Sequence, residues 1–312
     1  MEKELSTVTK PGWNLKKIIT GQWELLLLVL PVILYYILFQ YIPMYGLVIS
    51  FKDFQPGSTI LGSKWVGFTW FQEFFASPYF WRSLKNTVII SIYSIVFFFP
   101  LPIIFALVLN EIKSNTFKRL TQTISYMPYF ISTVVVVGIL NNFLSINTGF
   151  VNILLKNLGM EPYNFMASIG WFRPLYIFTD IWQGLGWNAI IYIAALSGID
   201  TEQYEAAKID GASRLKQIWH ISLPGILPTV IILLILRVGS VLNVGFEKII
   251  LMYSPANYQV SDVISTYVYR SGILQMRFSY ATAVGFFNSA INFVVLVLFN
   301  RLSRKVSEVS LW

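Results

Sequence analysis

Few residues of this 312-residue chain are suited to covalent chemistry. His220 is the only histidine, there is no cysteine, and neither G-x-x-x-x-G-K-[ST] nor H-E-x-x-H occurs. We therefore predict no catalytic residue, no metal site and no phosphate-binding loop for ATP on this chain. What stands out instead is a pair of triplets, Glu205-Ala206-Ala207 and Asp210-Gly211-Ala212. The alanines leave a flat spot where the surface of another protein could approach the helix backbone closely.

Capping signals place the first triplet on a short helix, TEQYEAAKI. Asp200 or Thr201 is a suitable N-cap, and Gln203 follows Asp200 at the spacing of a capping box. Gly211 is expected to end this helix, because glycine adopts positive φ at little cost.

A second helix is predicted over residues 213–222, and Pro224 then opens the next helix. One face of this second helix is apolar and carries Leu215, Ile218 and Trp219. The other face is polar and carries Arg214, Lys216, Gln217 and His220. Judged by amphipathic spacing alone, the segment is either a docking site or an ordinary connector resting on the membrane.

The composition is that of a membrane protein. Hydrophobic residues make up 55% of the chain and charged residues only 12%, whereas a soluble domain carries roughly a quarter charged residues. The mean hydropathy is +0.62. We assign the net charge of +8 to cytoplasmic loops and anionic lipid headgroups rather than to nucleic acid. The fold class predicted is an all-α membrane protein.

Several apolar runs approach the roughly 20 residues that a helix needs to cross a bilayer. We predict six membrane-spanning helices, at about residues 24–49, 87–109, 122–146, 174–197, 225–244 and 281–300. Prolines within the first two spans are expected to bend them, as is tolerated in a packed bundle.

Basic residues set the predicted orientation. The short segments EIKSNTFKRL and NRLSRK are rich in lysine and arginine, which favours the cytoplasmic side. The predicted domains are a cytoplasmic tail at 1–23, a six-span domain at 24–300 with a cytoplasmic loop at about 200–224, and a cytoplasmic tail at 301–312. The segment SDVISTYVYRSGIL has helical character and is expected to lie along the outer surface.

The two triplets, followed by Ile221 and Leu223-Pro224, resemble the cytoplasmic EAA loop of ABC-importer permeases. Together with YIPMYGLVISFKDF and SDVISTYVYRSGILQMRFSYATAVG, the loop resembles the carbohydrate-uptake permeases, most closely the branch for oligosaccharides and polysaccharide fragments. The likeness covers nearly the whole chain. It implies a type I ABC-importer permease fold with six transmembrane helices, in the bacterial cytoplasmic (inner) membrane.

The resemblance also implies partners. These are a second permease, usually a different chain, two cytoplasmic ATPase subunits that bind ATP and magnesium, and an external or periplasmic sugar-binding protein. In such permeases the first short helix of the loop docks on the ATPase. Carried over to this sequence, the coupling residues are Glu205, Ala206, Ala207, Asp210, Gly211, Ala212, Leu223 and Pro224. The chain itself is then neither an enzyme nor a binder of cofactors.

A path for sugar should place aromatic faces, amides and charged groups inside the spans. The candidates are Trp182, Gln183, Asn188, Tyr192, Arg237, Asn243 and Asn288. Polar groups at membrane depth are functional candidates by default. The alternatives are that Asp180 pairs with Arg237, that the asparagines bridge helices, and that Trp182 anchors the membrane interface.

Three other functions make different demands on the sequence. An ABC permease for a non-sugar solute fits the same loop, since the loop marks the motor contact and not the cargo. An ion-coupled secondary transporter would favour acidic residues at a midplane site, but Asp180 is the only clear carboxylate within a predicted span. An intramembrane enzyme would need a nucleophile–base or metal set that the sequence does not offer.

Overall fold

The structure is a computed structural model that describes residues 23–307 together with 310 and 311. It divides into two compact units, residues 1–49 and 50–312, which are taken separately below. The predicted tail at 1–23 lies outside the described residues except for Trp23. Of the predicted tail at 301–312, residues 301–307 continue the last helix.

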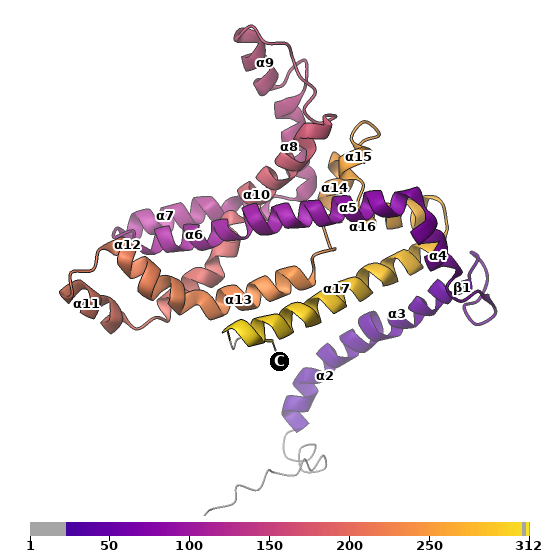
Figure 1. Cartoon of the computed structure of the whole chain (residues 1–312), viewed down its shortest axis with the longest axis horizontal. Helices are drawn as coiled ribbons and strands as arrows, with labels where there is room; N and C mark the ends of the chain where they lie inside the picture. The colour runs from indigo at the N-terminus through magenta and orange to yellow at the C-terminus, as the bar shows by residue number, and fades with distance from the viewer. Residues whose placement is uncertain (1–22, 308–309, 312) are drawn as a thin grey trace, which may run out of the picture. The chain divides into compact units, whose positions relative to one another are not determined.

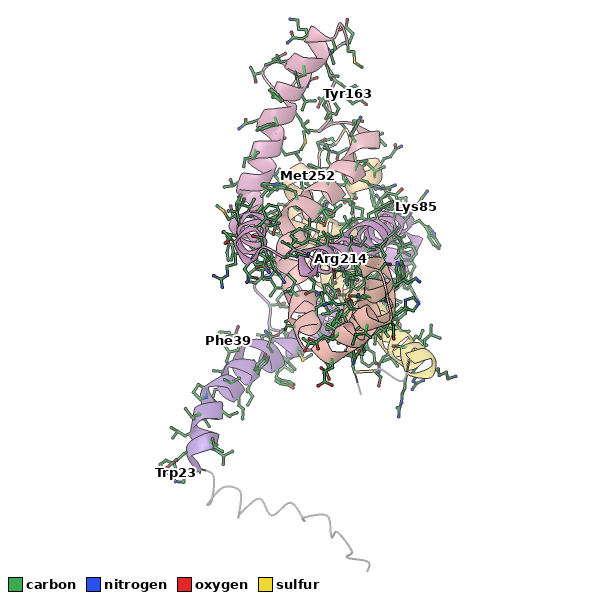
Figure 2. The ribbon with its side chains drawn as sticks, turned by 90° about the vertical axis from the view of Figure 1, so that its left-hand side faces the viewer. Trp23, Phe39, Lys85, Tyr163, Arg214 and Met252 are labelled. Atoms are coloured by element: carbon green, nitrogen blue, oxygen red, sulfur yellow. The ribbon has the colours of Figure 1, made fainter. Side chains whose placement is uncertain are left out.

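The first unit is one interrupted helix. α2 (Trp23–Tyr36) passes through the π turn η1 (Ile37–Tyr41) into α3 (Ile42–Met44), and the 3-10 helix η2 (Tyr45–Phe51) follows. The wider π turn lies just before Pro43, which cannot donate a helical hydrogen bond. Residues 23–45 are all exposed, and Figure 2 shows side chains such as those of Trp23 and Phe39 projecting from the helix. A helix that is apolar on all sides is typical of a membrane span.

The second unit begins with two short strands, so the fold is mostly helical rather than purely α. Lys52 lies opposite Trp65, and Asp53 opposite Lys64, in an antiparallel pair. The first elements of this unit are β1 (Lys52–Asp53), β2 (Lys64–Trp65), α4 (Thr69–Ala76), α5 (Pro78–Tyr93), the π turn η3 (Ser94–Phe98) and α6 (Pro100–Asn110). The π turn η3 again lies just before a proline, Pro100.

Helices make up the rest of the second unit. In Figure 1, α13 and α17 run side by side, and α10 packs along α6 and α7. The elements in chain order are α7 (Asn115–Tyr126), η4 (Met127–Phe130), α8 (Thr133–Leu144), α9 (Phe150–Asn157), α10 (Ile169–Ser197), α11 (Thr201–Ile209), α12 (Arg214–Gln217), η5 (Ile218–Ser222), α13 (Leu223–Gly239), α14 (Phe246–Met252), α15 (Tyr258–Ser261), α16 (Ile264–Tyr269), η6 (Arg270–Leu274) and α17 (Phe278–Ser307).

Within the described residues, four helices are long and apolar enough to cross a membrane, or five if one bent pair counts as a span. The four are Trp23–Phe51, Pro78–Asn110, Arg214–Gly239 and Phe278–Lys305, and they overlap the first, second, fifth and sixth predicted spans. The bent pair overlaps the third. The number six therefore remains a prediction.

The third predicted span is not one continuous helix. Its two parts, Asn115–Phe130 and Thr133–Leu144, meet at an angle of 96°. The 3-10 turn η4 contains Pro128 and ends at Ile131, whose backbone is extended. Ser132 then caps α8 by accepting a hydrogen bond from the Val135 N–H. Proline and a new N-cap together end one helix and start another.

The fourth predicted span corresponds to α10, which has 29 residues. At 1.5 Å per residue it is about 43 Å long, enough to cross a bilayer. It is not among the four apolar helices, because polar groups such as Arg173, Asp180, Gln183 and Asn188 interrupt its sequence.

The predicted boundary between the second loop helix and the fifth span is wrong. α12, η5 and α13 form one helix from Arg214 to Gly239. The π turn η5 lies just before Pro224 and joins the two parts without a break, because its wider hydrogen-bond spacing accommodates the proline. The loop helix is thus a direct extension of a span.

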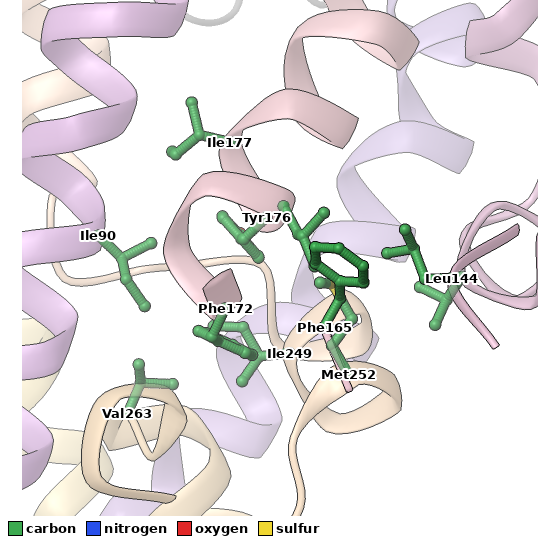
Figure 3. Close-up of a cluster of buried hydrophobic side chains, with 11 residues drawn as sticks. Ile90, Leu144, Phe165, Phe172, Tyr176, Ile177, Ile249, Met252 and Val263 are labelled. Atoms are coloured by element: carbon green, nitrogen blue, oxygen red, sulfur yellow. The ribbon is translucent and has the colours of Figure 1, made fainter. Parts of the chain in front are cut away.

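Buried apolar side chains of three helices form one cluster in the second unit. Figure 3 shows Ile90 of α5, Phe172 and Tyr176 of α10, and Ile249 and Met252 of α14 in one cluster. Through this cluster the short helix α14 is fixed against α10. The polar segment 240–245, between α13 and α14, is thereby held beside α10.

The segment SDVISTYVYRSGIL is helical in part, as predicted, but it does not lie on the surface. Asp262 and Val263 are 0% exposed, and Ile264 is 1% exposed. Burial of Asp262 is possible because Arg82 of α5 and Arg270 of η6 both form ion pairs with it. The expectation of a surface helix failed because it ignored these ion-pair partners.

Candidate functional site

A cavity of about 380 Å³ lies between the α5–η3 segment, α10 and the chain that follows α13. It combines hydroxyl, amide and charged groups with the rings of Phe98, Tyr129 and Tyr176. The lining residues are Ser91, Ser94, Ile95, Phe98, Tyr129, Tyr176, Asp180, Gln183, Gly184, Arg237, Ser240, Val241, Asn243, Val244 and Gly245. Such a mixture can bind a polar ligand that also has apolar faces.

Five of the predicted path residues line this cavity or its neighbour. Gln183, Arg237 and Asn243 line the first cavity. Asn188 and Tyr192 line a second cavity of about 270 Å³, to which Arg237 also contributes. The sequence therefore selected residues that the fold brings together from α10, α13 and the segment after α13.

The other two predicted residues lie outside both cavities. Asn288 donates a hydrogen bond to the Asn243 side-chain oxygen at 2.9 Å, and Asn292 donates to the same oxygen at 3.1 Å. Both asparagines therefore join α17 to the non-helical segment after α13 and position Asn243, rather than bridging two helices as the alternative expected. Trp182 is 42% exposed.

Phe98 lies at the boundary between the two cavities and was missed by sequence reasoning. Phe98, Arg237 and Ser240 line both cavities. A Cβ atom on Gly184 would lie 2.9 Å from the Phe98 ring, so the ring packs closely against α10. The available sequence signal was Pro100, two residues later; in the structure Phe98 ends a π turn before this proline, and π turns often occur at functional sites.

The charged groups pair differently from the expected alternative. Asp180 accepts a hydrogen bond from Lys248 Nζ at 2.5 Å, and the Lys248 side chain is only 7% exposed. Arg237 instead donates a hydrogen bond to the Ser94 hydroxyl. Lys248 was missed because it lies outside the predicted spans, where a lysine is common and does not indicate a functional site.

We expect the Asp180→Asn substitution to lower the free energy of unfolding by about 3 kcal/mol, since it leaves the buried Lys248 ammonium unpaired. Thermal unfolding of the purified protein in detergent measures the change. The double substitution Asp180→Asn with Lys248→Met should recover most of the loss, because it removes both charges. A double variant as unstable as the single one would contradict this account of the pair.

The predicted short helix, its N-cap and its glycine end are present in the structure. Asp200 is the N-cap of α11 and accepts a hydrogen bond from the Glu202 N–H. Gly211 has a φ of 75°, the left-handed conformation that glycine adopts at little cost. The Ala212 N–H bonds the Ala207 carbonyl at 2.8 Å, so the turn satisfies the last carbonyls of α11.

The loop is attached to the helix bundle by side chains. Tyr204 shares a hydrogen bond with Ser222 at 2.9 Å, across the two arms of the loop. Arg214 forms an ion pair with Glu111, at the end of α6, at 3.6 Å. A cavity of about 790 Å³ lies between α11 and the chain after α6, and Glu205, Lys208 and Ala212 contribute to its lining. Side-chain contacts thus join α11 to η5 and α12 to the end of α6.

The predicted faces of the second loop helix need one correction. Gln217, assigned to the polar face, is buried and donates to the Ala212 carbonyl at 2.9 Å. Leu215 and Trp219, by contrast, are 69% and 65% exposed. Amphipathic spacing failed here because the amide of Gln217 is needed to hold the turn.

Residues 98–308 match the family model described as binding-protein-dependent transport system inner membrane component. This chain belongs to that family. It is therefore an inner-membrane component of a binding-protein-dependent transport system. The matched residues include α10 and α13, which line both cavities, and the whole loop at 200–224.

Two relatives of this inner-membrane component come from Bacillus subtilis (strain 168), and one of them is named as a permease. It is 44% identical to the polygalacturonan/rhamnogalacturonan transport system permease protein YteP of Bacillus subtilis (strain 168), over 93% of this chain and 91% of that protein. It is 43% identical to protein LplB of the same organism, over 92% and 91% of the two chains.

A solved structure supports the same assignment. One chain in the crystal structure of a bacterial alginate ABC transporter, in complex with an alginate pentasaccharide-bound periplasmic protein, is 41% identical to this inner-membrane component. The two superpose with a TM-score of 0.88 over 95% of this chain and 99% of the other.

Proposed function

We propose that this chain is a permease subunit of an ATP-driven importer of oligosaccharides, and that it works by alternating access. The observation that carries the proposal is the polar and aromatic cavity between α10, η3 and the segment after α13. Aromatic rings suit the C–H faces of a sugar, and amides suit its hydroxyls. The cargo class is supported by the permease named for polygalacturonan and rhamnogalacturonan transport and by the alginate transporter.

The energy source in this proposal is a pair of cytoplasmic ATPase subunits that hold ATP and magnesium. Their contact would be α11 and the turn after it, where Glu205, Ala206 and Asp210 are exposed. Because α12 continues into α13, a movement of this contact would act on a span directly. A second, different permease and an external sugar-binding protein complete the importer. The proposed coupling residues are Glu205, Ala206, Ala207, Asp210, Gly211, Ala212, Leu223 and Pro224.

We infer a six-span topology of the type I importer class, with both termini in the cytoplasm. The four apolar helices, the bent pair and α10 would supply the six spans. The natural chain has no cysteine, so an Ala206→Cys variant carries a single reactive thiol. A membrane-impermeant maleimide should label it in inside-out vesicles and not in right-side-out vesicles. The reverse pattern would contradict the orientation.

Asn243→Ala is expected to raise the KM for oligosaccharide uptake about fivefold, the effect of losing one hydrogen bond to the cargo. Asn243 is suited to this contact because it lines the cavity and two asparagines of α17 orient it. Asn141→Ala is the matched control, since Asn141 is exposed on α8. Equal KM values for the two variants and the natural chain would place the path elsewhere.

Uptake by the assembled importer in proteoliposomes tests the proposed function. Labelled oligosaccharide should accumulate when ATP is supplied on the ATPase side and the binding protein on the other side. Accumulation driven by a proton or sodium gradient without ATP would make the chain an ion-coupled transporter. Accumulation of a non-sugar solute in place of oligosaccharides would agree with the proposed ATPase coupling but contradict the proposed cargo.

A further inference from the structure

The first cavity carries a positive charge that no carboxylate neutralises. Its charged lining residues are Asp180 and Arg237. Asp180 is engaged by Lys248 at 2.5 Å, which makes that pair neutral. Within the described part of the chain, no carboxylate lies within 4 Å of Arg237, and its hydrogen bond goes to the uncharged Ser94. One positive charge is therefore left over in the cavity.

A second excess of positive charge lies at the start of α10. Asp262 accepts hydrogen bonds from Arg82 at 2.6 Å and from Arg270 at 2.8 and 3.1 Å. Asn86 joins this group to a third arginine, because it donates to the Asp262 carbonyl and accepts from Arg173 at 2.9 Å. Two arginines thus share one carboxylate, and a third, Arg173, is connected to them only through Asn86.

These arginines are positively charged and incompletely satisfied. Burial alone lowers the pKa of Arg270, but its hydrogen bonds to Asp262 raise the pKa overall, so the group keeps its charge. The buried Nε–H groups of Arg82 and Arg173 have no hydrogen-bond partner among the described residues.

Helical spacing connects the arginine cluster with the cavity. Arg173, Asp180 and Gly184 lie at i, i+7 and i+11 on α10, and therefore on one face of that helix. Seven residues correspond to about 10 Å along the helix axis. Asp180 and Gly184 line the cavity, so Arg173 extends the same face toward the N-terminal end of α10. Arg173 on this face and Arg237 in the cavity are thus two positive charges with no ion pair among the described residues.

We propose that Arg173 and Arg237 select acidic saccharides, whose sugar units carry carboxylates, and that Arg237 is the residue that sets this preference. The inference rests on the proposed function and narrows its cargo. A guanidinium binds a carboxylate through two parallel hydrogen bonds, and it does so more strongly where water is excluded. A neutral sugar makes no such contact and leaves the charge of Arg237 uncompensated. Arg173 would act before Arg237 along the path.

The test measures binding to the assembled complex of permeases and ATPases without the binding protein, so that the binding protein cannot select the sugar. Equilibrium dialysis compares a linear galacturonate trisaccharide with the neutral trisaccharide made by reducing its carboxyl groups. The natural complex should bind the acidic trisaccharide about tenfold more tightly, the effect of one charge-assisted hydrogen-bonded pair. Arg237→Gln should remove this preference, and Arg237→Lys should keep much of it.

Arg277→Gln is the matched control, because the charge of Arg277 is already balanced by Glu73 at 2.7 Å. It should leave the preference unchanged. Equal binding of the two trisaccharides by the natural complex, or a preference that survives in Arg237→Gln, would overturn the inference. ATP-driven uptake of the neutral trisaccharide as fast as the acidic one would also overturn it, yet would leave the proposed function standing. A complex that accumulates neither sugar overturns both.

Discussion

Replacing Gly211 by valine should lower ATP-driven uptake at least about tenfold while the importer still reaches the membrane. Gly211 has a φ of 75°, where an L-residue costs about 1–2 kcal/mol and a β-branched one is strongly disfavoured. A Cβ at this position would meet nothing within 4 Å in the chain, so the fold has room for the side chain. The valine should therefore distort the turn that orients α11 and change the shape of the surface that would contact the ATPase.

Gly159 provides a matched control for this substitution. It also has a φ of 75°, a Cβ there would likewise meet nothing within 4 Å, and it lies just after α9, far along the chain from the coupling loop. Gly159→Val carries the same local backbone strain and should leave uptake and sugar-stimulated ATP hydrolysis near their natural values. If the two valine variants lose uptake equally, the turn at Gly211 has no special part in coupling.

Gly186→Val should destabilise the protein by about 3 kcal/mol, at the upper end of the usual cost of overpacking. A Cβ on Gly186 would lie 2.3 Å from the Ser125 carbonyl oxygen and 2.5 Å from its carbon. Both atoms belong to the backbone, which cannot turn aside like a flexible side chain. α7 and α10 would have to separate, and the cavity wall formed by Gln183 and Gly184 would shift with them.

Thermal unfolding in detergent measures this effect, together with the yield of assembled importer. Gly138→Val is the control, because Gly138 lies within a helix, is exposed, and a Cβ there would meet nothing within 4 Å. Its unfolding temperature should stay close to that of the natural chain. An equally stable Gly186→Val variant would show that α7 and α10 do not cross as closely as the structure indicates.

The coupling loop could be predicted well because its structure depends on local chemistry. Asp200 as an N-cap and Gly211 at positive φ follow from the preferences of single residues, and both are confirmed. Five of the seven path candidates line the two cavities, because polar side chains on apolar helices tend to face an internal cavity or another polar group. The family resemblance supplied the rest of the functional reading.

What the sequence did not predict depends on contacts between distant residues. The Asp180–Lys248 pair joins α10 to α14, and the two arginines that pair with Asp262 come from α5 and η6. Neither periodicity nor hydropathy contains this information. The break after Pro128 was missed because its apolar surroundings read as one span, although Ser132 is a capping residue type.

Cross-linking from position 206 tests the central claim most directly, namely that a separate ATPase drives this chain through α11. In the assembled importer, an Ala206→Cys variant would be paired with single cysteines placed along the surface groove of the ATPase. The account predicts a cross-link to the ATPase that stops sugar uptake, and recovery of uptake when the cross-link is reduced. Failure of the thiol to reach the ATPase, together with uptake by this chain when no ATPase is present, would contradict it.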